Sequence, residues 1–303
     1  MIKIERIDPR DPRALPLWQG SEDEQVRLYP PEALSLYTPK RLAEENIRFY
    51  LGTLDGTPAA IGGYKAHKNY ADLKRIFVAD TARGLGLGPA LMAHLEREAG
   101  FESLPLMKLE TGIHSPAAIK FYTRLGYRPC EKYGDFLGHP ISVFMEKPLI
   151  TTRPASPDEP ATASLLRQSH ALMQSLFPAE TCHFLDFDAL KAPNIRFFVA
   201  TRQTQTLGTG ALALKEGYAE LKSMFVDTQA RGSGAADAIM HRLESTASAE
   251  GITDIKLETG TGLDAAHRLY TRHGYTPCGP FGDYIGQDTA YNLYFEKTLS
   301  FPG

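Results

Sequence analysis

Hydrophobic residues along this chain fall into short runs typical of strands and into spaced series typical of helices. Both patterns occur between Asp72 and Ala99. An apolar run around 73–78 predicts a strand, and leucine, methionine and alanine residues at helical spacing over 91–99 predict an amphipathic helix. A glycine-rich turn, 83–88, joins the two, and Pro89 suits the first helical turn because a missing N–H costs nothing there.

The same stretch occurs a second time. A constant separation of 148 positions relates Arg83 to Arg231 and Tyr122 to Tyr270. Because the correspondence covers nearly all of each half, it predicts two complete domains, 1–148 and 149–303. The prolines between 154 and 160 correspond to a proline-rich segment near residue 10. They therefore predict a surface loop within the second domain, and the near-absence of a linker predicts contact between the domains.

Each half is predicted to contain strands interspersed with helices, as in α/β or α+β proteins. In the first half an opening strand is followed by polar helices through about Glu45, a hairpin, the strand–turn–helix unit, and then a further strand, helix and closing strand. The predicted bounds are Ile2–Arg6, Arg48–Leu54, Pro58–Tyr64, Leu106–Glu110, Ser115–Leu125 and Ser142–Glu146.

Composition narrows the classes of function. The chain has 303 residues, a hydrophobic fraction of 43% and a net charge of −3, as in globular proteins of two domains. It lacks the basic excess of nucleic-acid-binding proteins, a long apolar segment for membrane spanning and the apolar core of a signal peptide. Three cysteines without a ligand pattern argue against metal and disulfides, so we expect a cytoplasmic protein.

The glycine turn has the chemistry of an anion site. A helix N-terminus leaves N–H groups unpaired and carries the positive end of the helix dipole, and glycines let a bulky anion approach the backbone. A plain structural turn is the alternative for a single copy. Recurrence of the Arg-Gly-x-Gly sequence at 83–86 and 231–234 makes that alternative weaker. Neither copy has the spacing of a nucleotide P-loop or of a dinucleotide-binding turn.

Two sequence blocks, each present twice, resemble the GNAT superfamily of acyl-CoA-dependent N-acetyltransferases. The first is the loop pattern at 83–88 and 231–236. The second is Leu-Glu-Thr-Gly at 109–112 and 257–260, followed by Tyr122 or Tyr270 and then by Gly-Tyr. The resemblance implies two tandem folds, each with a mixed, splayed central sheet and helices on both faces. It also implies acetyl-CoA in the splay, its pyrophosphate on the loop amides and its pantetheine arm along the preceding strand.

The resemblance assigns residues to these roles. Those implied to bind the cofactor are Phe77, Val78, Ala79, Arg83, Gly84, Leu85, Gly86, Leu87, Gly88, Ser115 and Tyr122 in the first half, and Phe225, Val226, Asp227, Arg231, Gly232, Ser233, Gly234, Ala235, Ala236 and Tyr270 in the second. Relatives often have Asn or Gln seven positions before the tyrosine, where this chain has Ser115 and Leu263. This departure puts the contact in doubt in the second half.

Acetyl transfer to an amine needs a base and a proton donor. The resemblance places a base at the start of the strand before the loop, where this chain has Glu220 and Asp72. A carboxylate there could take the proton that an alkylammonium must lose before it attacks, and a solvated strand-end charge is the alternative. The resemblance gives Tyr270 and Tyr122 the role of proton donor to the leaving thiolate, against simple packing. Glu110 and Glu258, on the next strand, are less favoured as bases, and their recurrence in both halves fits a structural hydrogen bond equally well. The longer Glu220 favours chemistry in the second half, whereas Leu263 argues against it.

The reading that results is an N-acetyltransferase that moves an acetyl group from acetyl-CoA to a primary amine by direct attack in a ternary complex. The expected partner is a small-molecule amine, with no nucleic acid, membrane or metal, and a homodimer stays open. Two alternatives remain: a tandem pseudoenzyme that senses acyl-CoA, in which one or both halves are non-catalytic, and an acyltransferase for longer chains. The acceptor is unreadable, because variable segments of each half set it.

Overall fold

The computed structural model divides into two compact units, Met1–Leu149 and Ile150–Gly303. It describes the whole chain except residues 30–36, 135–140, 179–181, 183, 288–289 and 301–303. Leu149 alone separates the last strand of the first unit from the first strand of the second, so the predicted boundary is one residue early. None of the helices in the described ranges has the length and apolar character needed to cross a membrane.

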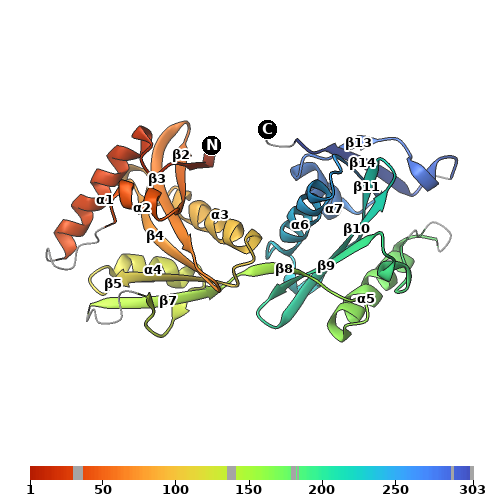
Figure 1. Cartoon of the computed structure of the whole chain (residues 1–303), viewed down its shortest axis with the longest axis horizontal. Coiled ribbons are helices and arrows are strands. Elements are labelled where there is room, and N and C mark those ends of the chain that lie inside the picture. Colours follow the sequence, from red (N-terminus) through yellow and green to blue (C-terminus); the bar gives the residue numbers. More distant parts are fainter. Residues whose placement is uncertain (30–36, 135–140, 179–181, 183, 288–289, 301–303) are drawn as a thin grey trace. The chain divides into compact units, whose positions relative to one another are not determined.

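The first unit is built on a mixed seven-stranded sheet in the order β1-β2-β3-β4-β5-β7-β6 (Figure 1). All its predicted strands are confirmed, most of them one or two residues longer than expected, and the short β6 was not predicted. Its elements are β1 (Ile2–Ile7), α1 (Leu15–Leu28), α2 (Pro39–Glu44), β2 (Arg48–Leu54), β3 (Thr57–Ala66), β4 (Ala71–Val78), α3 (Leu87–Phe101), β5 (Leu106–Gly112), α4 (Pro116–Arg124), β6 (Arg128–Pro129) and β7 (Ser142–Pro148).

The second unit repeats this topology in a sheet of order β8-β9-β10-β11-β12-β14-β13. The proline-rich segment lies between β8 and α5, inside this unit as predicted. Its elements are β8 (Ile150–Pro154), α5 (Pro160–Leu176), β9 (Ile195–Arg202), β10 (Gln205–Lys215), β11 (Tyr218–Val226), α6 (Ala235–Ala249), β12 (Asp254–Gly260), α7 (Asp264–Arg272), β13 (Thr276–Cys278) and β14 (Asn292–Thr298).

Each sheet is covered on both faces, as predicted. In the first unit Tyr50 points to the core formed with α3 and α4, whereas its neighbours Phe49 and Leu51 point to the core formed with α1 and α2. In the second unit Leu212 packs under α6 and Ala211 packs toward α5. This alternation of buried side chains places the functional strands β4 and β11 between two helical layers.

A β-bulge interrupts β4 and β11 at the same place. Arg75 and Ile76 lie opposite the single residue Gly62 of β3, and Arg75 has a φ of 58°. Its counterpart Ser223 has a φ of 52° at the matching shift between β10 and β11. A positive φ is uncommon for such residues, and a bulge of this kind bends the strand and turns its backbone groups.

Candidate active site

The central parallel strands of each unit pair over a very short length. β4 pairs with β5 only at Ala71 and Asp72, and the rest of β4 has no partner strand on that side among the described residues. β11 pairs with β12 only from Ala219 to Leu221. The strands therefore separate just beyond the predicted acids Asp72 and Glu220. This is the splayed sheet that the sequence predicted, and it leaves a free backbone edge along the following residues of β4 and β11.

The two glycine loops lead from this edge to a helix N-terminus. Four loop glycines have left-handed φ values, which only glycine adopts without strain: Gly84 at 81°, Gly86 at 85°, Gly232 at 75° and Gly234 at 93°. The first turn of each helix follows directly on a glycine, and neither N-cap glycine has a side chain to cap it. In α6 the Ser233 hydroxyl accepts a hydrogen bond from the Ala235 amide at 3.4 Å. Amides at a helix start that a glycine loop leaves accessible can bind a phosphate group, so the loops have the geometry of an anion site.

The remaining predicted cofactor residues lie around this loop, although some of their polar groups already have partners. The amides of Ala79 and Asp227 donate to β3 and β10, at 2.8 Å to Ala59 and 2.9 Å to Leu207. The C-terminal ends of β4 and β11 contribute Phe77, Val78, Phe225 and Val226. The loop and the first helical turn contribute the others: Leu85, Leu87, Gly88, Ser233, Ala235 and Ala236.

The two loop arginines differ. In the first unit the Nε of Arg83 donates to the Val78 carbonyl at 3.1 Å, and its Nη2 lies 2.8 Å from the Glu24 carboxylate of α1. In the second unit Arg231 is exposed and makes no hydrogen bond or ion pair with any residue that the structure describes. Arg231 is therefore available to an anion at the loop, whereas Arg83 is held on its own strand.

The acid of the first unit is buried in a small polar network. Asp72 is 7% exposed and accepts hydrogen bonds from Lys74 Nζ at 2.6 Å and from the Tyr133 hydroxyl at 3.0 Å. Lys74 is equally buried. Burial of the pair disproves the alternative of a solvated strand-end charge. Lys74 was missed, although an acid and a lysine two positions apart on a strand point to the same face.

The second unit has a matching network with a different tyrosine. Glu220 is 5% exposed, and its Oε1 accepts hydrogen bonds from the Tyr284 hydroxyl at 2.7 Å and from Lys222 Nζ at 3.1 Å. Tyr284 also lies 2.7 Å from Lys222. It stands at the end of a short 3₁₀ helix, Gly282–Tyr284. Neither Tyr133 nor Tyr284 could be predicted from the repeat, because the two tyrosines do not occupy equivalent positions in it.

The predicted proton donors are deeply buried tyrosines. Tyr122 of α4 and Tyr270 of α7 are 8% and 6% exposed, and their rings pack against Tyr127 and Phe295. Burial raises the pKa of both phenols, and the Glu258 carboxylate raises that of Tyr270 further. A phenol with a raised pKa stays protonated and can donate. Both residues therefore fill the packing role and keep the proton that the predicted catalytic role needs.

The second pair of acids is not equivalent in the two units. Glu110 of β5 accepts a hydrogen bond from the Ser142 hydroxyl at 2.6 Å, as a structural role would require. Glu258 of β12 makes no hydrogen bond with any described residue. Burial, with a smaller contribution from the negative Glu220, raises the pKa of Glu258 to about 7, although Lys222 opposes the shift.

The Ser115 hydroxyl, which was predicted to contact the cofactor, already makes a hydrogen bond within the protein. The Ser115 hydroxyl lies 2.7 Å from the hydroxyl of Tyr29, the residue that ends α1. Ser115 stands immediately before α4, and Leu263 occupies the corresponding place before α7. A ligand at Ser115 would have to share that hydroxyl with Tyr29, so Ser115 is a weaker contact than the sequence suggested.

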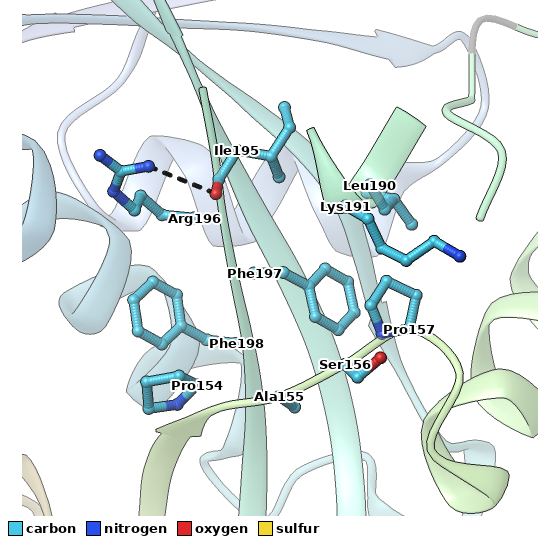
Figure 2. Close-up of a pocket in the computed structure, with 10 residues that line it drawn as sticks. All are labelled: Pro154, Ala155, Ser156, Pro157, Leu190, Lys191, Ile195, Arg196, Phe197 and Phe198. Atoms are coloured by element: carbon cyan, nitrogen blue, oxygen red, sulfur yellow. Dashed lines mark hydrogen bonds between the residues drawn. The ribbon is translucent and has the colours of Figure 1, made fainter. Parts of the chain in front are cut away.

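An open cavity of about 410 Å³ in the second unit lies away from the splay. It borders β9, which β10 separates from β11. Figure 2 shows two phenylalanine rings and the proline-rich loop beside it, with the Lys191 ammonium extending outward. Its ten lining residues include no carboxylate, and Lys191 pairs with Asp158 and Asp188. The lining residues are Pro154, Ala155, Ser156, Pro157, Leu190, Lys191, Ile195, Arg196, Phe197 and Phe198.

Within the described residues no group of three or more histidine, cysteine, aspartate or glutamate side chains could hold a metal ion. The splay is lined by carboxylates, tyrosines and lysines. Carboxylates and phenols at the mouth of a splayed sheet suit proton transfer. The glycine loops beside them suit a phosphate-bearing donor.

Comparison with known proteins identifies the fold in both units. The sequence model of the Acetyltransferase (GNAT) family matches residues 14–127, and that of the Acetyltransferase (GNAT) domain matches residues 193–277. The "IAA acetyltransferase" of Azospirillum brasilense is 38% identical over 154 residues, covering 50% of this chain and 99% of that protein. The uncharacterized N-acetyltransferase YedL of Escherichia coli (strain K12) is 34% identical over 128 residues, covering 41% and 80%.

Solved structures are similar to about half of the chain. The PaiA N-acetyltransferase of Thermoplasma acidophilum, in complex with coenzyme A, is 18% identical with a TM-score of 0.41, covering 49% of this chain and 99% of that one. The relative from A. brasilense is covered over almost its whole length, at an identity that establishes common descent. This chain therefore belongs to the GNAT family of acyl-CoA-dependent N-acetyltransferases, which use acetyl-CoA, and it carries two copies of the family's domain.

Proposed function

We propose that the protein transfers an acetyl group from acetyl-CoA to a primary amine of a small or amino-acid-like molecule, by direct attack in a ternary complex. The short parallel pairing carries this proposal. In each unit the strands separate at a buried carboxylate or one residue beyond it, beside a glycine loop that leads into a helix N-terminus. Donor, acceptor and proton-transfer groups can meet at that point, and holding reactants together is a large part of catalysis.

Acetyl-CoA supplies the acetyl group and the thiol leaving group. The loops 83–88 and 231–236 would hold its pyrophosphate, and the free edges of β4 and β11 would pair with its pantetheine arm. Tyr122 and Tyr270 are placed to donate a proton as the thiolate leaves, because burial keeps their phenols protonated. Asp72 and Glu220 hold the lysine and tyrosine of each network at the closed end of the splay.

The experiment measures free thiol released from acetyl-CoA with a panel of amines. IAA is tested beside the amine panel as a separate acceptor, because the relative from A. brasilense is named for it. Amine-dependent release with formation of the N-acetylated product is the expected outcome. Binding of CoA without turnover of any acceptor would contradict the proposal and favour a tandem acyl-CoA sensor.

A second candidate is a chain in which only the second unit is catalytic. It is favoured by Arg83, which is bound to the Val78 carbonyl and to Glu24 in the first unit, whereas Arg231 is available in the second. Single-unit chemistry predicts that changes confined to the loop of the first unit leave amine-dependent thiol release intact.

A further inference from the structure

Glu258 occupies the point where the central strands of the second unit part. The last parallel pair joins Leu221 of β11 to Leu257 of β12, so Glu258 is the first residue of β12 beyond it. Leu221 and Leu257 belong to the core under α6 and α7. Because side chains alternate along a strand, Glu258 lies on the opposite face, together with Glu220 and Lys222.

Glu258 and Glu220 differ in how their carboxylates are used. The Oε1 of Glu220 already accepts hydrogen bonds from Tyr284 and Lys222, at 2.7 and 3.1 Å. Glu258 is only half-buried, and within the described residues it forms no hydrogen bond, so its oxygens are open to a ligand or water. A general base must come within hydrogen-bond reach of the proton that it accepts, and a free carboxylate meets this condition better than one that already has two donors.

The groups facing Glu258 come from every neighbouring element. They leave it poised between its charged and neutral forms, with a pKa of about 7, because burial and Glu220 raise the pKa while Lys222 lowers it. Tyr270 approaches from the helical side of the gap, and its own pKa responds to Glu258. The charged and titratable neighbours are Glu220 and Lys222 on β11, Tyr270 on α7, Tyr284 on the 3₁₀ helix and Tyr294 on β14.

We propose that Glu258 is the catalytic base of the second unit and that Glu220 is a positioning residue. This inference rests on the proposed acetyl transfer and moves the role predicted for Glu220 to the next strand. The free carboxylate of Glu258 takes the proton of the acceptor ammonium, while Glu220 fixes Lys222 and Tyr284 beside it.

Tyr270 is the second proton-transfer group, and with it the protons of the reaction balance. Glu258 takes one proton from the ammonium, and the freed nitrogen bonds to the acetyl carbon as the bond from that carbon to sulfur breaks. Tyr270 gives its proton to the departing sulfur and recovers the second proton from the nitrogen as the amide forms. Glu258 then releases its proton to water. An ammonium and a thioester thus become an amide, a thiol and one proton.

The first unit provides a natural contrast. Glu110 occupies the matching place on β5, but the Ser142 hydroxyl binds it at 2.6 Å. Asn292 stands at the corresponding position of β14, opposite Gly260. Burial alone raises the pKa of Tyr122, whereas Glu258 adds to the effect on Tyr270. A carboxylate that raises the pKa of the predicted proton donor is therefore a feature of the second unit.

The test is made in a chain whose first unit is disabled by Asp72→Asn with Gly86→Val. Amine-dependent thiol release should rise with pH through about 7, because the base acts only when deprotonated. Glu258→Gln should lower kcat/KM by about 100-fold or more and remove this rise, with acetyl-CoA affinity unchanged within twofold. Glu220→Gln should keep the rise near pH 7. Glu110→Gln, at the matching place, should change neither quantity.

The outcomes separate this inference from the proposed function. If the disabled-first-unit chain binds acetyl-CoA but turns over no amine, chemistry in the second unit is contradicted, and the inference with it. The intact chain then tests the proposed function separately. If the background chain is active and Glu258→Gln keeps both the rate and the rise near pH 7, the inference alone is overturned. Loss of the rise in Glu220→Gln instead would return the role of base to Glu220.

Discussion

The hydroxyl of Tyr284 lies 2.7 Å from Oε1 of Glu220, and both side chains are buried. The first unit reproduces this contact between Tyr133 and Asp72 at 3.0 Å, from a tyrosine that stands at a different position of the repeat. Phe281 occupies the position equivalent to Tyr133. The two units therefore keep the contact while drawing the donor from different places in the segment before the last strand.

Removing this donor should destabilise the second unit. Tyr284→Phe leaves Glu220 buried with Lys222 as its remaining partner, and we expect the free energy of unfolding of this unit to fall by about 1–3 kcal/mol. Urea unfolding, fitted with one transition for each unit, measures the change. The control is Tyr291→Phe, whose side chain is exposed, with an expected change within about 0.5 kcal/mol. Equal effects of both substitutions would contradict a structural role for the Tyr284 hydroxyl.

The loop glycines should be needed for CoA binding. Gly86→Val together with Gly234→Val puts side chains where φ is 85° and 93°, which costs an L-residue about 1–2 kcal/mol each and turns the amides away from the phosphate. We expect CoA affinity measured by calorimetry to fall at least about tenfold. Gly56→Val with Gly217→Val is the matched control, since these hairpin glycines have φ values of 83° and 81°. Unchanged affinity in a folded loop variant would refute the assignment.

The two loop arginines should give different phenotypes. Arg231→Ala removes a cation that is available to an anion, so we expect weaker CoA binding with little change in stability. Arg83→Ala breaks contacts to Val78 and Glu24, so we expect a small loss of stability in the first unit, about 0–1 kcal/mol for a partly exposed pair. Calorimetry and urea unfolding of the two variants provide the comparison. The reverse pattern would show that Arg83 leaves its strand to bind the ligand.

Asp237 should make the second unit sensitive to acid. It lies in the first turn of α6, and hydrogen bonds from His273 and Arg272 lower its pKa to about 2. Because the folded pKa is below the unfolded value, the stabilisation is complete above about pH 4 and is lost as the pH falls toward 2. The shift corresponds to about 2 kcal/mol.

This effect is measured by comparing Asp237→Asn with the unchanged chain in urea at several pH values. The difference in unfolding free energy should be largest near pH 5, should be much smaller at pH 2 and should vanish only below pH 2. A difference that stays constant over this range would mean that the substitution acts through packing or helix capping rather than through the charge of Asp237.

Much of the architecture could be predicted from the repeat, because a constant separation between equivalent residues reflects a constant order of strands. The splay could be placed through the family resemblance, which implies that the sheet opens between the strand before the glycine loop and the next strand. The asymmetry between the sites of the two units could not be predicted. Glu24 binds Arg83, but its repeat position in the second unit holds Leu172, which cannot form an ion pair. The ion pair between Glu24 and Arg83 forms only when α1 packs on the sheet, so the sequence alone does not reveal it.

The difference between Glu110 and Glu258 was hidden for a similar reason. Its source is the residue on the last strand, Ser142 in one unit and Asn292 in the other. These positions lie beyond the insertion that breaks the constant separation. The sequence therefore predicted the two glutamates as equivalents, although their carboxylates have different surroundings.

The bulge in β4 makes the site depend on the exact length of that strand. Leu73 and, after the bulge, Ile76 and Val78 face the core under α3, whereas Phe77 faces α1. Deleting Arg75 would restore regular pairing and leave Ile76, Phe77 and Val78 on their present faces, but β4 would lose the bend and the turned backbone groups that the bulge produces ahead of the glycine loop. Natural variants should accordingly gain and lose residues in the hairpin turns and leave this strand's length untouched.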